Sequence, residues 1–322
     1  MFSVVEQVAQ DFKRAESRDM FGILEVRNIN DTMEEAMSRP NPRNLWSSCW
    51  YEGEVCCLFA DSNVGKSILA VQIAEEIART EKVLYFDFEL SDKQVQLRYT
   101  DEAGNLHKFP SNLLRSYINA DEITAIEDFE EAIINSIEQM AVGKEAKVLI
   151  IDNLTYLCST AEKGDTAGKL MLRLMQLKRK YGWSILVLAH TPKRTLSNPI
   201  TQNDLAGSKK LYNFFDSAFA IGRSAKDSNL RYVKQVKVRH GSYQYDGDNV
   251  MVFSIEKEGA MLKFSLHGYA EEREHLKELS ENEDGELKSR IIHLHSIGKS
   301  YREIASELAV SLGKVQRVLK KQ

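Results

Sequence analysis

The middle of the chain alternates short, continuously apolar runs with longer amphipathic segments. Runs such as "KVLII" and "SILVLA" are typical of strands buried on both faces, which occur in parallel sheets flanked by helices. We predict four such strands, at residues 54–60, 82–90, 147–153 and 184–191. Helical periodicity predicts the helices between them, at residues 65–80, 91–103, 122–140 and 166–181.

The pattern changes after residue 215, where strands and turns follow one another directly. The segments "SAFAIG", "RYVKQVKVR", "NVMVFSIEK" and "MLKFSLHG" are expected to be antiparallel strands. Near the N-terminus, apolar residues at helical spacing predict a short amphipathic helix that packs on its own body or on a neighbouring subunit; they are Phe2, Val5, Val8 and Phe12. The predicted fold class is α/β, with a mainly parallel central sheet and an antiparallel extension.

The last part of the chain reverses its charge. Residues 271–286 hold eight acidic residues and two basic ones, which predicts a solvated linker. Residues 287–322 hold eight lysines and arginines against two glutamates, and their pattern predicts three helices. Ser300 and Glu303 form a capping box that opens the second helix, and Ser311 can cap the third. The expected domains are therefore an N-terminal extension (1–45), an α/β domain (46–270), an acidic linker (271–286) and a small all-α domain (287–322).

Two short helices separated by a turn, the second of them basic, describe a helix-turn-helix that binds DNA. Its expected groove residues are Lys314, Gln316 and Arg317. The alternative is a three-helix bundle that docks a protein.

Composition narrows the class of protein further. The chain has 322 residues, of which 43% are hydrophobic and 28% charged, as in ordinary globular proteins. Its net charge of −4 argues against a generally basic surface. Four cysteines without C-x-x-C spacing, no signal peptide and no apolar stretch of 18 residues predict a cytoplasmic protein without a membrane span; the cysteines are Cys49, Cys56, Cys57 and Cys158.

The stretch "ADSNVGKS" has most of a phosphate-binding loop, G-x-x-x-x-G-K-[ST], between a predicted strand and a predicted helix. Ala60 replaces the first glycine, and a methyl group is the smallest intrusion that a side chain can make there. Lys66 is expected to reach the terminal phosphates of ATP, and Ser67 to hold Mg²⁺. The expected nucleotide-binding residues are Ala60, Asp61, Ser62, Asn63, Val64, Gly65, Lys66, Ser67 and Ile68.

Two acidic residues follow strands of the predicted sheet. Asp152 ends the apolar run "KVLIIDN", where a ligand to the Mg²⁺ ion or its water is needed opposite the loop. Glu89 lies at the end of the predicted strand that comes after the loop helix, and a carboxylate there can orient and deprotonate the attacking water. The alternative for Glu89 is an acid favoured by the dipole at a helix N-terminus.

In this order the elements resemble the RecA/DnaB superfamily of ring-forming motor ATPases over residues 45–265, most of all the RepA-type hexameric helicases of plasmids and mobile elements. The matching segments are "ADSNVGKS", Glu89, "VLIIDN", "LVLAHTPKR" and "YVKQVKVRHG". The resemblance implies that His190 senses the terminal phosphate, whereas the plainer alternative is a histidine that only caps a strand. It also implies that Lys237 and Arg239 reach across a subunit boundary to the neighbour's nucleotide, and the alternative is a solvated basic strand.

The resemblance further implies a ring whose interior binds DNA phosphate through Ser208, Lys209 and Lys210. It predicts a RecA-like, DNA-dependent ATPase with ATP and Mg²⁺ as cofactors, which works as a hexameric helicase or replication initiator. An ATP-switched DNA-binding regulator or loader would use the same site without unwinding DNA. A signalling ATPase of the clock-protein type, without DNA, is disfavoured by the basic C-terminal helices.

Overall fold

The computed structural model describes residues 19–21, 24–118, 129–153, 165–191, 194–205, 209–278, 281–308 and 310–320. The chain forms two compact units, residues 1–43 and residues 44–322. The first unit contains an antiparallel pair, β1 (Asp19–Phe21) and β2 (Leu24–Val26), and helix α2 (Ile29–Met37). Asn28 caps α2 by accepting a hydrogen bond from the backbone amide of Asn30. The helix predicted from Phe2 to Phe12 lies outside the described residues.

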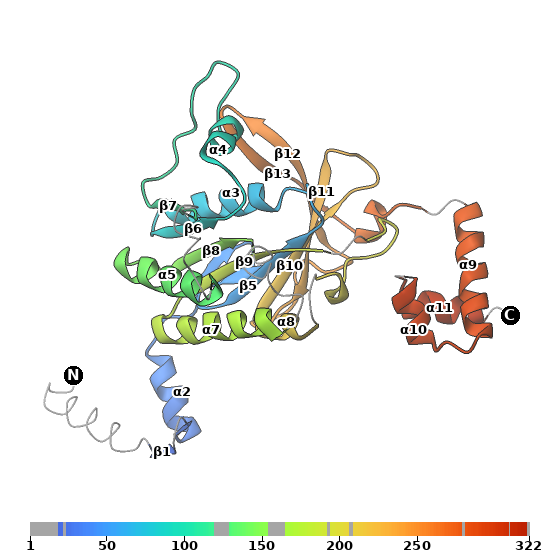
Figure 1. Cartoon of the computed structure of the whole chain (residues 1–322), viewed down its shortest axis with the longest axis horizontal. Coiled ribbons are helices and arrows are strands. Elements are labelled where there is room, and N and C mark those ends of the chain that lie inside the picture. The colour runs from blue at the N-terminus through green and yellow to red at the C-terminus, as the bar shows by residue number, and fades with distance from the viewer. Residues whose placement is uncertain are drawn as a thin grey trace, which may run out of the picture. The chain divides into compact units, whose positions relative to one another are not determined.

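A nine-stranded sheet forms the centre of the second unit (Figure 1). Its order is β13-β12-β11-β10-β5-β9-β8-β6-β7, in which the strands from β10 to β7 are parallel and β11 to β13 form an antiparallel extension. This arrangement confirms the predicted α/β class, with a mainly parallel central sheet and an antiparallel extension. The strands are β5 (Val55–Ala60), β6 (Val83–Asp87), β7 (Leu113–Ser116), β8 (Val148–Asp152), β9 (Ser184–His190), β10 (Ser217–Arg223), β11 (Leu230–Lys237), β12 (Val250–Glu258) and β13 (Met261–Ala270).

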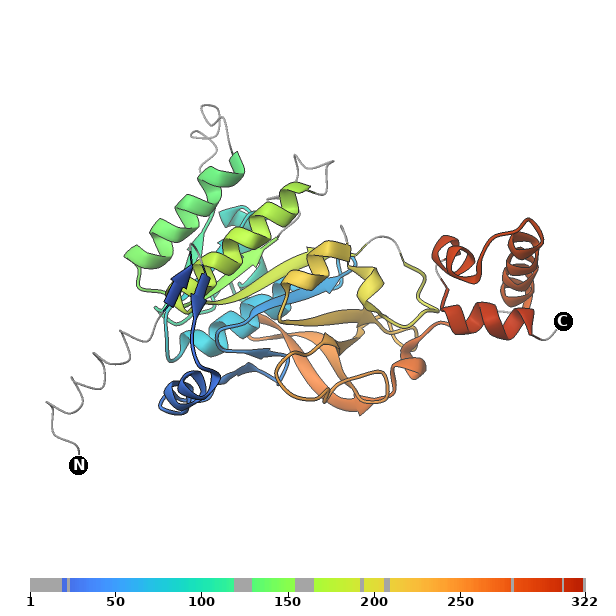
Figure 2. The same cartoon turned by 90° about the horizontal axis from the view of Figure 1, so that it is seen from below.

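Helices cover both faces of the sheet. On one face lie α5 (Phe129–Gly143) and α7 (Asp165–Tyr181), side by side in Figure 2, together with α8 (Lys209–Phe214). On the other face lies α3 (Lys66–Ala78), whose buried side chains include Leu69, Ile73 and Ile77. The short pair β3 (Asn44–Trp46) and β4 (Trp50–Tyr51) contributes Trp46 and Trp50 to that same core. Burial of strands on both faces explains their continuous apolar runs.

Strand β10 corrects one prediction. The segment "SAFAIG" was expected to be antiparallel, but β10 pairs in parallel with β5 and is antiparallel only to β11. Its first six residues are all buried, which is the pattern of a strand covered on both faces rather than of a half-solvated antiparallel strand. The antiparallel extension therefore begins one strand later than predicted.

Strand β7 was not predicted. It is a four-residue edge strand, and all four of its side chains are half-buried, so the sequence "LLRS" carries no clear alternation. Helix α4 (Asp92–Arg98) is shorter than predicted, while α5 extends beyond residue 140. Strand β11 ends at Lys237, so Arg239 lies beyond the strand that the two residues were expected to share.

The acidic segment is not a simple solvated linker. A 3-10 turn, η3 (Glu272–His275), packs on the α/β domain, and Glu272 is buried there with its carboxylate bonded to the Lys234 ammonium and the Ile200 amide. A second 3-10 turn, η2 (Gln202–Asp204), follows Ile200. Helix α9 (Glu281–Ser296) then includes the last acidic residues of the segment.

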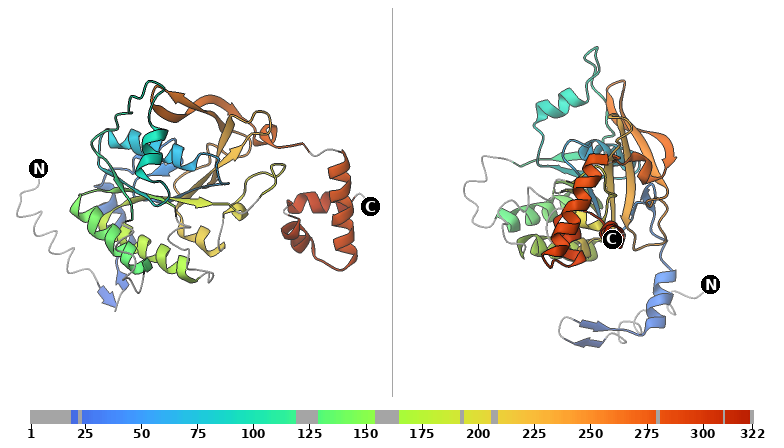
Figure 3. Two further views of the ribbon diagram at one scale, coloured as in Figure 1. Left: turned by 45° about the horizontal axis from the view of Figure 1, so that its top comes forward. Right: turned by 90° about the vertical axis from the view of Figure 1, so that its right-hand side faces the viewer.

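Helices α9, α10 (Tyr301–Glu307) and α11 (Leu312–Leu319) form a group of their own, drawn in red in Figure 3. Ile291, Ile304 and Val315, one from each helix, are fully buried against one another. The Ser300–Glu303 capping box opens α10, and the Ser311 hydroxyl accepts from the Lys314 amide at the start of α11. Among the described residues, no helix is both long and apolar enough to cross a membrane.

Candidate active site

The carboxyl ends of the parallel strands bring the predicted site residues to one edge of the sheet. Ala60 at the end of β5 pairs with His190 at the end of β9. Asp152 at the end of β8 pairs with Asp87 at the end of β6. In open parallel sheets this edge is where ligands bind, because the loops that leave it diverge around a crevice.

The loop between β5 and α3 has the backbone shape of an anion cradle. Asn63 and Gly65 both have positive φ angles, +60° and +108°, and Gly65 is the N-cap of α3. A Cβ atom at Gly65 would lie 2.9 Å from Ile255 and 3.0 Å from Phe264, so both the φ angle and the space require glycine. The free amides of the helix start and the positive end of its dipole favour a phosphate at this place.

Lys66 is folded back into the loop. Its ammonium donates to the backbone oxygens of Ala60, at 3.0 Å, and Asp61, at 3.1 Å. It also lies 3.1 Å from Nδ1 of His190. Burial lowers the pKa of Lys66, while the carboxylates of Asp152 and Glu89 act in the opposite direction. A buried cation held only by neutral acceptors is well suited to an anionic ligand, which would replace these contacts with stronger ones.

Asp152 is almost fully buried, and its two oxygens differ. One oxygen, Oδ2, accepts a hydrogen bond of 2.7 Å from the Tyr85 hydroxyl. The other, Oδ1, has no hydrogen-bond partner among the described residues. Burial raises the pKa of Asp152 to about 6, although hydrogen bonds from Ser67 and Tyr85 act in the opposite direction. An orphaned carboxylate oxygen next to a serine hydroxyl fits the oxygen donors that Mg²⁺ prefers, so Ser67 and Asp152 are suited to hold this ion.

Glu89 lies two residues beyond the end of β6, and its carboxylate faces the same edge. Its Oε1 accepts from the side-chain amide of Asn153 and lies 3.5 Å from Nε2 of His190. The Asp87 carboxylate holds the turn by accepting from the amides of Glu89 and Leu90. Glu89 also precedes α4, yet the contact with His190 places it in the site and not only at a helix start.

His190 joins the loop to Glu89. Because the Lys66 ammonium can only donate, Nδ1 of His190 accepts, and the ring proton of the neutral form lies on Nε2. This atom lies 3.1 Å from the side-chain amide of Asn153 and 3.5 Å from the Glu89 carboxylate. Burial and then the Lys66 charge lower the pKa of His190, which keeps the ring neutral at pH 7. A neutral donor beside a carboxylate and an ammonium is suited to respond to a phosphate placed between them.

Sequence reasoning assigned no role to Tyr85 and Asn153. Tyr85 is buried inside an apolar strand, where a tyrosine is indistinguishable from a core residue until its hydroxyl finds Asp152. Asn153 directly follows Asp152, and this polar residue at the end of an apolar run was the only available signal.

Lys237 and Arg239 do not join this site. The Arg239 guanidinium bonds the Asp216 carboxylate at 2.7 Å, and the Lys237 ammonium bonds the Tyr212 carbonyl at 2.8 Å. The same Asp216 carboxylate accepts from the amide of Val55, the first residue of β5. Arg239 therefore lies at the end of the sheet where β5 begins, whereas the phosphate loop follows the last residue of β5. The length of β5 separates the two by roughly 15–20 Å.

The residues expected to bind DNA are only partly described. Ser208 lies outside the described residues, and of Lys209 and Lys210 only the backbone at the start of α8 is described. Gln316 and Arg317 are exposed on α11, and Lys314 lies half-buried in its first turn.

Comparison with known proteins gives one family. The model of the AAA domain matches residues 24–195, more than half of the chain, and this range contains the loop, Glu89, Asp152 and His190. Among solved structures, the chain is similar to a KaiC-like protein from the hyperthermophilic archaeon Pyrococcus horikoshii OT3, with 13% identity and a TM-score of 0.49, over 67% of this chain and 91% of that one. No curated protein matches the sequence. The matched range and the loop within it show that the chain belongs to the AAA domain family of P-loop ATPases.

Proposed function

We propose that this ATPase acts on DNA, as a ring-forming helicase or replication initiator of the RepA type carried by a plasmid or other mobile element. The observation that supports the DNA part is the C-terminal group of helices. Its two short helices begin at side-chain caps and bury Ile304 and Val315, while Gln316 and Arg317 on α11 face solvent. A basic helix presented in this way suits the major groove of DNA.

The residues of the site divide the chemistry among them. Lys66 binds the terminal phosphates of ATP together with the amides of the loop. Mg²⁺, held by Ser67 and Asp152, supplies charge neutralisation of the phosphates when bound. Glu89 orients the attacking water and accepts its proton, and the neutral His190 donates from Nε2 toward the terminal phosphate. Asn153 keeps the Glu89 carboxylate turned toward this place.

Glu89→Gln tests the role of Glu89 in hydrolysis and provides the control for the DNA activity. The variant should bind ATP as the wild type does but lose most turnover, because an amide cannot accept the proton of the water. Nucleotide affinity is measured by calorimetry and turnover by phosphate release. Weak binding together with normal turnover at saturating ATP would make Glu89 a structural residue only.

Strand separation on a forked duplex tests the proposed function. The wild type should hydrolyse ATP faster when DNA is present and separate the strands, whereas Glu89→Gln should bind the fork without separating it. If the wild type hydrolyses ATP and binds DNA in a nucleotide-dependent way but separates nothing, the protein is an ATP-switched regulator or loader instead.

Ala60→Gly tests whether the missing glycine of the loop matters. Ala60 ends β5, is buried, and its carbonyl accepts from the Thr191 amide and the Lys66 ammonium, so a glycine keeps every one of these contacts. We expect turnover within about tenfold of the wild type, which corresponds to about 1.4 kcal/mol in the barrier. A thousandfold gain in the same phosphate-release assay would show that the natural loop is impaired.

A further inference from the structure

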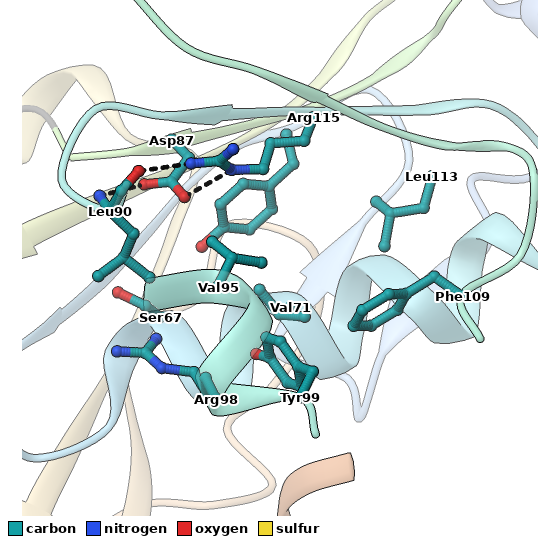
Figure 4. Close-up of a pocket in the computed structure, with 11 residues that line it drawn as sticks. Ser67, Val71, Asp87, Leu90, Val95, Arg98, Tyr99, Phe109, Leu113 and Arg115 are labelled. Carbon is teal, nitrogen blue, oxygen red and sulfur yellow. Dashed lines mark hydrogen bonds and ion pairs between the residues drawn. The ribbon is translucent and has the colours of Figure 1, made fainter. Parts of the chain in front are cut away.

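A cavity of about 120 Å³ lies beside the active site, between α3, α4, β6 and β7 (Figure 4). Most of its wall is apolar and comes from Val71, Leu90, Val95, Phe109 and Leu113. Cavities of about 150 Å³ with walls of this kind are known to hold a benzene molecule. This cavity is somewhat smaller, and its apolar wall has the polarity that suits a small ring.

Two polar atoms of the wall lack partners. The Tyr99 hydroxyl and Nη1 of Arg98 are buried and have no hydrogen-bond partner among the described residues. Tyr99 is only 4% exposed, and its ring packs edge-on against Phe109. A buried donor without a partner costs free energy. A ligand that accepts hydrogen bonds from both groups would therefore bind with a favourable contribution from each.

The other charged groups of the wall satisfy one another. Arg115 donates to the carboxylates of Asp87 and Asp92 and to the carbonyl of Leu90. Figure 4 shows Arg115 and Asp87 on one side of the cavity and Arg98 and Tyr99 on another. Burial raises the pKa of Tyr99 to about 12, against the effect of the Arg98 charge, so its hydroxyl keeps the proton at neutral pH. The wall groups with an unpaired buried atom are thus Nη1 of the Arg98 guanidinium and the neutral hydroxyl of the neighbouring Tyr99.

We propose that this cavity is a binding site for a small aromatic ligand that carries one anionic acceptor, such as a carboxylate. The ring lies against Val71, Val95 and Phe109, and the acceptor receives hydrogen bonds from Tyr99 and Arg98. The cavity borders the phosphate loop, because Ser67 lines it, as does Tyr85, whose hydroxyl bonds Asp152. A bound ligand would therefore touch Ser67, which holds the catalytic ion in the proposed function, and Tyr85, which bonds the other ion ligand, Asp152.

The probe for this site is 4-fluorobenzoate, titrated into the full-length protein without nucleotide and followed by ¹⁹F NMR. The wild type should bind it saturably. Tyr99→Phe should weaken binding about tenfold, because one hydrogen bond to a charged acceptor is lost. Fluorobenzene, which has no acceptor, should bind the wild type and Tyr99→Phe equally well.

Val71→Phe should abolish the binding of both probes by filling the cavity. Val142→Phe is the matched control, because Val142 is exposed at the end of α5, and it should leave both affinities unchanged. Thermal unfolding checks that each variant is folded. If Val71→Phe does not fold, the comparison of Tyr99→Phe with the wild type still tests the proposal. A non-hydrolysable ATP analogue should bind together with the probe.

Three results would overturn the proposal. One is the absence of saturable fluorobenzoate binding to the wild type in the millimolar range. Another is equal weakening of both probes by Tyr99→Phe, since the hydroxyl would then have no role in recognising the acceptor. The third is competitive displacement by the ATP analogue, which would make the cavity a part of the nucleotide site. None of them depends on hydrolysis or on DNA.

Discussion

Lys66→Ala is expected to abolish ATP hydrolysis and to weaken ATP binding. The Lys66 ammonium is the cation at the start of α3, and its present partners are two backbone oxygens and a neutral histidine. Its removal takes away the cation that the loop offers to the terminal phosphates, and the loss of even a single donor at such a place costs on the order of 10²–10³ in rate. Phosphate release at saturating ATP measures turnover, and calorimetry measures the affinity.

The matched control is Lys144→Ala, because Lys144 is an exposed lysine just beyond α5. It should hydrolyse ATP at the wild-type rate. Folding of Lys66→Ala is checked by thermal unfolding, and we expect no large loss of stability, since the variant removes a buried cation rather than leaving one unpaired. Unchanged turnover in Lys66→Ala would mean that the loop is not the site of hydrolysis.

Mixing Arg239→Ala protein with Lys66→Ala protein is expected to restore turnover that neither variant has alone. Within one chain, Arg239 and the loop lie beyond opposite ends of β5, so Arg239 cannot serve its own site. In a ring, an interface between the two variants can pair an intact loop with an intact Arg239. An arginine that stabilises the transferring phosphoryl group in this way contributes on the order of 10³–10⁵ in rate.

The restored activity should rise with total protein concentration as rings form. Arg273→Ala serves as the control partner, because Arg273 is an exposed arginine whose side chain bonds the half-buried Glu271, and this variant should be active without mixing. If analytical ultracentrifugation shows that the two inactive proteins assemble with each other and their mixture remains inactive, Arg239 does not act across a subunit boundary.

The sequence predicted most of the sheet and the active site because both depend on local pattern. Strands β5, β8 and β9 were predicted to within one residue at either end, since strands buried on both faces are continuous in apolar residues and stop at polar ones. Because Asp152 and His190 end two of these apolar runs, the sequence also predicted that both lie at the same edge of the sheet. Glu89 required one further step, because it follows the strand and reaches His190 through a turn.

What the sequence could not predict depends on contacts between distant segments. The direction of β10 is set by pairing with β5, more than 150 residues earlier, and no local pattern records it. The hydrogen bond from Tyr85 to Asp152 and the burial of Glu272 are likewise contacts across the fold. The Arg98 and Tyr99 donors carry no motif, and only the packing of α4 over α3 makes them the unpaired groups of a cavity.

The Asp216 carboxylate has a consequence for how readily a ring can form. Burial would raise its pKa, but the Lys178 ammonium, the Val55 amide and the Arg239 guanidinium together lower it. Lys178 is the more enclosed of the two cations, whereas the Arg239 side chain is 57% exposed. If Arg239 moves to a neighbour in the proposed ring, the buried Asp216 carboxylate therefore keeps the Lys178 ammonium as its partner. In the proposed ring, Arg239 could therefore leave its position in the isolated subunit without leaving a buried carboxylate unpaired.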